Sequence, residues 1–286
     1  MRTHEITATA SGTWTLGDRT VNRVGFGAKR LSATTAVDVL RRAIDLGVNH
    51  IDTATFYPTL AEAGHAMHEF TSLHWANEMI RAALAPYPDD LVIVTKVGPS
   101  EAGLARPDQL RAQVEQNLRE LGRDELDVVN LRQHGLESIA EHFGALAELR
   151  DAGLIRHLGV SNVRAEHLAQ ARAIAPVVCV QNRYGVEFGR VNDEMLNLCG
   201  ERAIAFVPFF SLAGTGREDG GVVRNEAVGT IARAHGVSSA QVRIAWTLSR
   251  GPHVLVIPGT GGLDHLVENV AAGALELSVD ELAALE

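Results

Sequence analysis

Short apolar runs alternate along the chain with longer stretches in which apolar residues recur every three or four positions. The short runs are rich in β-branched residues and almost continuously hydrophobic, which is typical of strands buried on both faces of a sheet. The longer stretches have the period of amphipathic helices, as in residues 36–46, 109–121, 139–151 and 240–248. Eight strands are expected, and they cover residues 23–27, 50–54, 91–96, 126–132, 157–162, 178–182, 204–209 and 254–259.

This alternation favours an α/β fold with a parallel sheet, because each parallel connection needs a crossover. Eight strand–helix units in about 260 residues suit a closed (β/α)8 TIM barrel better than an open sheet. A doubly wound open sheet would carry a glycine-rich phosphate turn, and Gly25-Phe26-Gly27 lacks the third glycine. Residues 12–22 predict an N-terminal β-hairpin that closes the barrel floor. We expect a single domain over residues 1–286.

Composition narrows the choice of partners. The chain is 46% hydrophobic and 21% charged, which is ordinary for a globular protein with one large core. Its net charge of −9 disfavours nucleic acid as a partner, because an acidic surface repels phosphate. No apolar run approaches the roughly 18 residues that span a bilayer, and the N-terminus lacks an apolar signal core. We therefore expect a cytoplasmic protein without a membrane partner, in which Cys179 and Cys199 are buried thiols. The oligomeric state is left open.

Polar and ionisable residues gather at the carboxyl ends of the expected strands. In a barrel of this type the chemistry takes place at that rim, so these ends are candidates for a site. In chain order they are Lys29, Asp52, Tyr57, Lys96, Arg132, Ser161, Asn162, Gln181, Asn182, Phe209, Gly259 and Thr260.

Asp52, Tyr57 and Lys96 suggest one mechanism. Adjacent strands bring a carboxylate and an ammonium within reach of each other. A partly buried ammonium beside a phenol favours the phenolate, so the phenol releases its proton more readily to a developing alkoxide. The alternative is a structural Asp–Lys pair with a tyrosine at the surface, and these three residues alone do not decide between the two.

Seven segments carry a family resemblance, and they read GTWTLGDRTVNRVGFGA, GVNHIDTATFY, VIVTKVG, GLIRHLGVSN, VQNRY, FVPFFSL and VIPGTGGLDHLVENVAA. In this order and on these strands they resemble the aldo-keto reductase family, over almost the whole chain. The resemblance implies a barrel enzyme that reduces an aldehyde or ketone to an alcohol, with hydride from NADPH and a proton from a tyrosine. By position, Asp52, Tyr57 and Lys96 match three of the four catalytic residues of the family.

The resemblance also implies a cofactor site. Ser161, Asn162 and Gln181 match the groups that hold the nicotinamide carboxamide, and Phe209 matches the aromatic residue that stacks on the ring. Serine, asparagine and glutamine supply the donors and acceptors that an amide needs. The other positions implied for the cofactor are Leu212, Gly214, Ile257, Gly259, Thr260, His265, Glu268 and Asn269.

Some positions depart from the family pattern. Arg132 stands where a catalytic histidine is common, and a bacterial branch of the family also reads Asn-Leu-Arg here, so Arg132 is the fourth catalytic candidate. His134 follows two residues later and is a candidate to contact substrate. Gly259 and His265 stand where the family often has basic residues for the 2′-phosphate, so NADH is also possible. Lys29 at the mouth is a candidate to contact an acidic substrate, and the alternative is an ordinary solvated lysine. These departures keep two alternatives open: non-redox chemistry such as elimination or cyclisation on a remodelled rim, and a non-catalytic protein that binds the cofactor.

A long loop is expected over residues 58–75, and loops of this length are often functional. We expect a lid that contacts substrate through Phe70, His74 or Trp75, and the alternative is a solvated loop without a role. A metal site is not expected, because His65 and His68 lie one helical turn apart without a third ligand.

Overall fold

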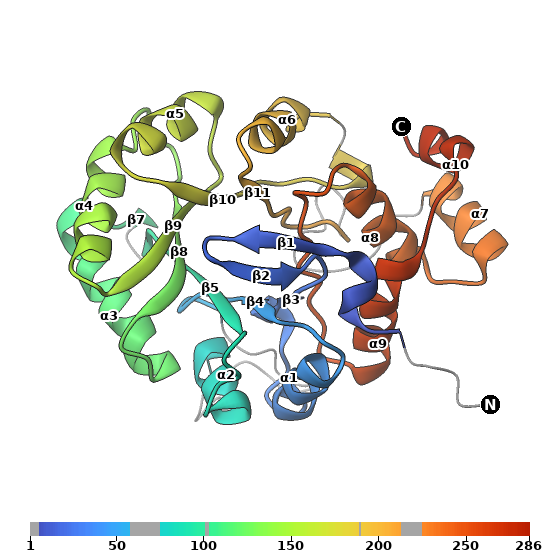
Figure 1. Cartoon of the computed structure of the whole chain (residues 1–286), viewed down its shortest axis with the longest axis horizontal. Coiled ribbons are helices and arrows are strands. Elements are labelled where there is room, and N and C mark those ends of the chain that lie inside the picture. Colours follow the sequence, from blue (N-terminus) through green and yellow to red (C-terminus); the bar gives the residue numbers. More distant parts are fainter. Residues whose placement is uncertain (1–5, 58–74, 101–102, 189, 213–224) are drawn as a thin grey trace.

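A parallel sheet curls at the centre of the molecule and helices surround it (Figure 1). The computed structural model describes residues 6–57, 75–100, 103–188, 190–212 and 225–286. The strand order in this sheet is β11-β10-β9-β8-β5-β4-β3, so neighbours in space are mostly neighbours in the chain. The strands are β3 (Phe26–Gly27), β4 (His50–Asp52), β5 (Val92–Val97), β8 (Leu126–Arg132), β9 (Ile155–Ser161), β10 (Val177–Gln181) and β11 (Ala205–Phe206).

Residues 254–256 close the sheet into a barrel. On one side the Val256 N–H donates to Arg23 O over 2.9 Å, and the Gly25 N–H donates to Val256 O over 2.8 Å. On the other side the Leu255 N–H donates to Phe206 O over 3.0 Å. The predicted (β/α)8 fold is therefore confirmed. The last strand is shorter than the predicted 254–259 and pairs only through isolated bridges, to Val24 and to Phe206.

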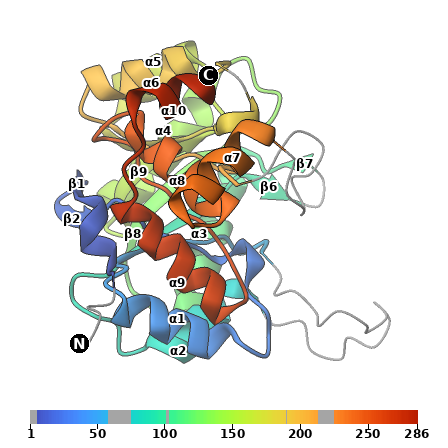
Figure 2. The same ribbon diagram turned by 90° about the vertical axis from the view of Figure 1, so that its right-hand side faces the viewer.

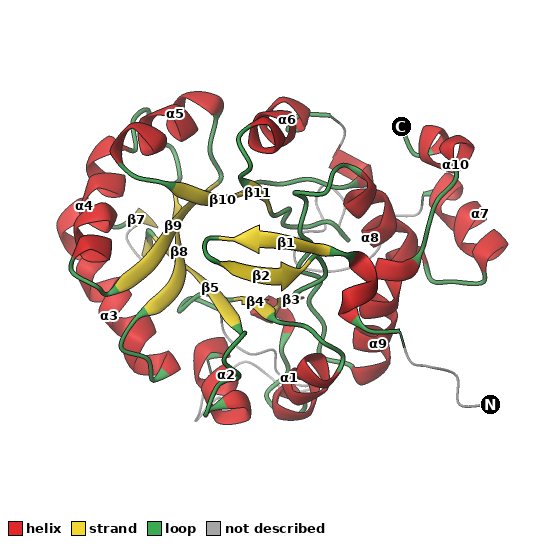
Figure 3. Ribbon diagram, in the orientation of Figure 1, coloured by secondary structure: helices red, strands yellow, loops and turns green. Residues whose placement is uncertain are grey.

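Amphipathic helices cover the outside of the strands (Figure 3). The α1 helix buries Val39, Leu40 and Ala43, which lie three and four residues apart on one face. The α3 helix ends at Gly122, whose backbone is left-handed with φ 64°. The helices of the described ranges are α1 (Ala36–Asp45), α2 (Ala76–Leu84), α3 (Leu110–Leu121), α4 (Ala140–Asp151), α5 (Ala165–Ile174), α6 (Asp193–Glu201), α7 (Glu226–His235), α8 (Ser239–Ser249), α9 (Leu263–Ala271) and α10 (Val279–Ala284).

The N-terminal hairpin is β1 (Thr13–Leu16) with β2 (Arg19–Asn22), and the two strands pair antiparallel. Leu16 and Val21 are buried. They pack in one cluster with barrel residues Val92, Val94, Val128, Cys179, Ala205, Val207 and Leu255. The predicted hairpin that closes the barrel floor is confirmed.

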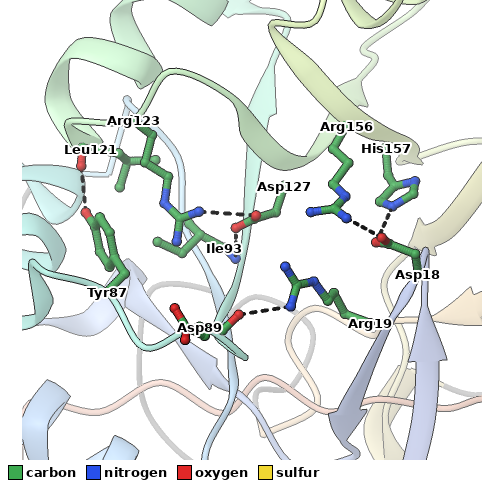
Figure 4. A network of polar contacts seen from close by, with 10 residues as sticks. All are labelled: Asp18, Arg19, Tyr87, Asp89, Ile93, Leu121, Arg123, Asp127, Arg156 and His157. Carbon is green, nitrogen blue, oxygen red and sulfur yellow. Dashed lines mark hydrogen bonds and ion pairs between the residues drawn. The ribbon is translucent and has the colours of Figure 1, made fainter.

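Ion pairs hold the hairpin turn against the amino-terminal ends of the strands (Figure 4). The Asp18 carboxylate contacts His157 Nε2 at 2.8 Å and accepts a hydrogen bond from Arg156, and both residues lie at the start of β9. These contacts, led by the hydrogen bond with His157, lower the pKa of Asp18. Arg19 Nη1 donates to the Asp89 carbonyl oxygen over 3.0 Å, ahead of β5.

A small antiparallel pair, β6 (Pro99–Ser100) with β7 (Gly103–Leu104), follows β5 and was not predicted from the sequence. It lies on the opposite side of the barrel from the hairpin (Figure 2), which marks the rim and the floor of the molecule. Both cysteines are free and buried, as predicted, and burial raises the pKa of each thiol to about 12. Within the described residues, no helix is long and apolar enough to cross a membrane.

Candidate active site

A buried ion pair lies at the carboxyl ends of two adjacent strands. Asp52 ends β4 and Lys96 lies near the end of β5, and Lys96 Nζ lies 2.5 Å from Asp52 Oδ1. The ammonium also donates to the Thr53 carbonyl oxygen over 3.0 Å. Burial lowers the pKa of Lys96, but the Asp52 carboxylate and the Tyr57 phenol outweigh burial, so the pKa is raised overall. Lys96 therefore stays protonated although only 2% of its surface is exposed.

Tyr57 lies next to this pair and is half-buried. The Lys96 ammonium is 5.1 Å from the centre of the Tyr57 ring. The backbone of Tyr57 is held from the far side, because its carbonyl oxygen accepts the Ala76 N–H over 3.0 Å. The structure therefore brings together Asp52, Lys96 and Tyr57, as the sequence predicts.

Gln181 joins the cluster from the opposite wall of the barrel. It ends β10, and its Nε2 donates to Asp52 Oδ2 over 2.6 Å. Its Oε1 atom is buried and has no hydrogen-bond partner within the described part of the chain. From the sequence we assigned Gln181 to the cofactor alone, whereas the structure also places it against the Asp52 carboxylate. The unused acceptor is suited to an amide N–H.

Arg132, the last residue of β8, lies between Ser161 and Phe209. Its Nη1 donates to Ser161 Oγ over 3.3 Å, and its guanidinium carbon is 5.0 Å above the Phe209 ring centre. This brings together three of the predicted site residues. His134 is exposed beyond the end of the strand.

Asn162 has a left-handed backbone, with φ 61°. Its Nδ2 donates to the Gln133 carbonyl oxygen over 3.1 Å, and the Gln133 side chain donates to the carbonyl oxygen of Asn162. The two residues therefore fix each other at the rim. Gln133 was missed in the sequence, because its partner is 29 residues away.

The segment after residues 254–256, the last strand, contributes backbone more than side chains. Gly259 lies so close to β3 that a Cβ atom there would meet the Gly27 carbonyl, so glycine is required by packing. Thr260 is buried, and its Oγ1 accepts the Gly262 N–H over 3.0 Å just ahead of α9. The remaining predicted cofactor residues in this region differ in exposure: His265 is exposed, Asn269 is buried, and Leu212, Ile257 and Glu268 are partly buried.

Two cationic side chains lie over the aromatic ring of Phe210 at the mouth of the barrel. Lys29 Nζ is 5.2 Å and the Arg183 guanidinium carbon 5.6 Å from the centre of the Phe210 ring. Phe210 packs edge-on against Phe209 with ring centres 5.1 Å apart. Sequence reasoning found Lys29 and Phe209 but missed Phe210 and Arg183, although both stand beside residues that it selected.

Part of the prediction lies outside the described residues, namely His65, His68, Phe70, His74 and Gly214. Trp75 is described and lies directly before α2, where its N–H donates to Glu78 Oε2 over 3.2 Å. Among the residues that the structure describes, no three His, Cys, Asp or Glu side chains are grouped to hold a metal ion.

Comparison with known proteins identifies the family of the chain. A model described as "Aldo/keto reductase family" matches residues 10–286. The chain belongs to the aldo/keto reductase family. A pyridoxine 4-dehydrogenase of Escherichia coli is 40% identical over 97% of this chain and 98% of its own length. A methylglyoxal reductase of the same organism is 30% identical over 98% of this chain and 89% of its own.

Solved structures agree with this assignment. An aldo/keto reductase from Klebsiella pneumoniae in complex with NADP and acetate has a TM-score of 0.78 at 30% identity, and the match covers 96% of this chain and 93% of that one. A structure of an aldo-keto reductase from the same organism in complex with NADPH has a TM-score of 0.78 at 29% identity, with the same coverage. Aldo/keto reductases are NAD(P)H-dependent oxidoreductases that act on small carbonyl compounds. The single-domain organisation over residues 1–286 stays a prediction.

Proposed function

We propose that this aldo/keto reductase reduces an aldehyde or ketone to an alcohol with NADPH, and that Tyr57 donates the proton to the carbonyl oxygen. The observation that carries the proposal is the buried Asp52–Lys96 pair beside the Tyr57 phenol. An ammonium kept charged next to a phenol stabilises the phenolate that remains after proton donation. Asp52 keeps Lys96 charged and in place through the 2.5 Å contact.

The residues at the rim fit a nicotinamide cofactor. The buried Gln181 Oε1 is an acceptor for a carboxamide N–H, and Phe209 offers an aromatic face. The exposed His265, in the first turn of α9, lies where a helix N-terminus favours an anion. When bound here, NADPH supplies the hydride. The NADP and NADPH complexes of the Klebsiella relatives support this choice of cofactor.

Arg132 is a cationic hydrogen-bond donor to the substrate in this proposal. A guanidinium donates hydrogen bonds in a fixed planar fork and does not release a proton near neutral pH. With Phe209 under its plane and Ser161 at one edge, Arg132 is oriented to donate to a carbonyl oxygen or to an acidic group of the substrate. Lys29 adds a second cation at the mouth. In this proposal Tyr57 alone supplies the proton, and Arg132 orients the oxygen.

The test follows NADPH absorbance with a panel of carbonyl compounds, including pyridoxal and methylglyoxal because of the named Escherichia coli relatives. Tyr57→Phe should lower turnover by at least about 100-fold, the scale of one general acid, with nearly unchanged NADPH affinity. Tyr87→Phe is the matched control, because that hydroxyl donates to the Leu121 carbonyl oxygen over 2.7 Å, far from the rim. Wild-type turnover in Tyr57→Phe would contradict the proposed mechanism, and no NADPH oxidation with any carbonyl would contradict the function.

A further inference from the structure

A chain of buried polar side chains lies directly behind the Asp52–Lys96 pair. Thr53 Oγ1 donates to Asn77 Oδ1 over 2.7 Å, and Asn77 Nδ2 donates to Asn117 Oδ1 over 3.1 Å. Thr95 Oγ1 donates to the same Asn117 Oδ1 over 2.5 Å. All four side chains are 0% exposed. This buried network therefore links Thr53, directly after β4, through α2 and α3 to Thr95 on β5.

The two threonines flank the ion pair in the sequence. Thr53 follows Asp52, and Thr95 precedes Lys96. Because successive side chains of a strand point to opposite faces, the threonines face the helices while the acid and the base face the barrel interior. The network thus binds β4 and β5 from the helix side of the sheet, through the two residues next to the ion pair.

The side-chain amides of this network have most of their hydrogen bonds made, which fixes their orientation. Asn77 Nδ2 has a second acceptor, Glu120 Oε2, at 2.9 Å. Asn117 Nδ2 donates to the Gln113 carbonyl oxygen over 2.9 Å. A buried polar network in which the members are satisfied is rigid and specifies one arrangement.

The same network is connected to the backbone of Tyr57. Asn77 is the second residue of α2, and the first, Ala76, donates its N–H to the Tyr57 carbonyl oxygen over 3.0 Å. Anchoring Asn77 to Thr53 and Asn117 therefore sets where the first turn of α2 stands, and with it the backbone of Tyr57. One network thus holds all three members of the site, without touching the reacting atoms.

We propose that Thr53, Asn77, Asn117 and Thr95 are positioning residues for the reaction, which set the spacing between the Lys96 ammonium and the Tyr57 phenol. The inference rests on the proposed function of the site. Loosening the network should change proton donation by Tyr57 and leave cofactor binding intact, because the cofactor residues lie at the ends of β9, β10 and β11 and after residues 254–256.

The experiment replaces a threonine of the network with valine, which removes the hydroxyl and keeps the size and branching of the side chain. Thr53→Val should lower kcat about 10-fold, since small misplacements of reacting groups are costly, with NADPH affinity within about 2-fold of wild type. The pH profile of kcat should shift, and Thr53→Ser, which keeps the hydroxyl, should restore both. Thr95→Val should have the same effect, because it removes the contact of the network with β5, and it replaces Thr53→Val as the test if that variant does not fold. Thr247→Val is the matched control, because that buried hydroxyl donates to the Arg243 carbonyl oxygen over 2.8 Å within α8.

A second readout does not depend on activity. The chain has three tyrosines, and the pKa of Tyr87 is raised by burial to about 12, while burial and Asp193 raise the pKa of Tyr184. Subtracting the titration of Tyr57→Phe from that of wild type isolates the phenolate absorbance of Tyr57, and this difference should move along the pH axis in Thr53→Val and Thr95→Val. If these variants match Thr247→Val in both kcat and phenolate titration, the positioning role is wrong. If wild type oxidises no NADPH with any carbonyl, the proposed function fails, while the phenolate titration still decides this inference.

Discussion

At the scale of single residues, Lys96 decides how the site is charged. The chain contains only two lysines, Lys29 and Lys96, and only Lys96 is buried. Burial favours the neutral amine, but Asp52 and Tyr57 together raise the pKa of Lys96. A group whose pKa is raised by folding stabilises the folded state at all pH values below its unfolded pKa of about 10.4. The ion pair is therefore intact throughout the neutral range.

Replacing Lys96 with methionine should separate this role from that of Lys29. Lys96→Met leaves the Asp52 carboxylate buried without its 2.5 Å partner and removes the cation beside Tyr57. We expect kcat to fall by about 100-fold or more and the pH profile to change shape. Lys29→Met should alter KM for acidic carbonyl substrates and leave the pH profile in place. Steady-state kinetics across pH measure both variants, and an unchanged profile in Lys96→Met would show that Lys96 does not tune the phenol.

Residue by residue, the sequence predicted the members of the site better than their contacts. Asp52, Tyr57 and Lys96 could be placed together because the carboxyl ends of parallel strands share one rim. The contact between Gln181 and Asp52 could not be predicted, since their strands lie on opposite walls and the distance between them depends on how the barrel closes. Asn77 and Asn117 were missed because their partners lie on other elements, and a polar residue on a helix gives no sign of facing inward.

At the scale of elements, the floor hairpin is held by apolar packing more than by its ion pairs. Leu16 is 1% exposed, whereas the Asp18 side chain is 45% exposed. Water screens an exposed pair, so its contribution to stability is small. The sequence predicted this hairpin because alternating residues and a Gly-Asp turn are local signals. The short β6–β7 pair was missed because two-residue strands are too short to show a period.

The two contributions can be compared directly. Leu16→Ala should lower the free energy of unfolding by about 2–5 kcal/mol, the usual range for a buried leucine. Asp18→Asn should lower it by no more than about 1 kcal/mol, because the pair with Arg156 and His157 is exposed. Urea unfolding at neutral pH measures both. A loss in Asp18→Asn as large as in Leu16→Ala would show that the ion pairs hold the floor.

The first turn of α9 should control cofactor choice. His265→Arg should increase the preference for NADPH over NADH about 10-fold, because a guanidinium pairs with a phosphate through two hydrogen bonds. Asp264→Asn, in the same turn, also makes the local charge more positive by one unit but supplies no such fork. Fluorescence titration with each cofactor gives the ratio. Equal ratios in the two variants would place the 2′-phosphate elsewhere.

At the scale of the whole molecule, a buried histidine makes stability depend on pH. Burial lowers the pKa of His50 from 6.5 to about 4, with the Asn22 backbone opposing part of the shift. Burial lowers the pKa of His253 as well. Between these pH values the unfolded chain binds a proton that the folded protein excludes. The contribution of His50 to the free energy of unfolding is therefore fully present above pH 6.5 and is lost as the pH falls towards 4.

The contribution of His50 over this window is at most about 3 kcal/mol, from the size of the shift. His50→Leu should flatten the dependence of the unfolding free energy on pH between 4 and 6.5, whatever its effect at neutral pH. Urea unfolding at a series of pH values measures the slope. An identical slope in the variant would assign the acid sensitivity to other groups.

The position of the floor hairpin also has a consequence for how the protein is made. The hairpin leaves the ribosome before the barrel strands, yet Leu16 and Val21 belong to one packed cluster with Leu255, more than 230 residues later. The hydrogen bond from Arg23 to the Val254 carbonyl oxygen spans 231 residues. At synthesis rates of about 5–20 residues per second, this apolar turn waits roughly 10–50 seconds for its last neighbours. During that interval the apolar side chains of the hairpin lack their final neighbours, and the barrel is closed only after residues 254–256 have been made.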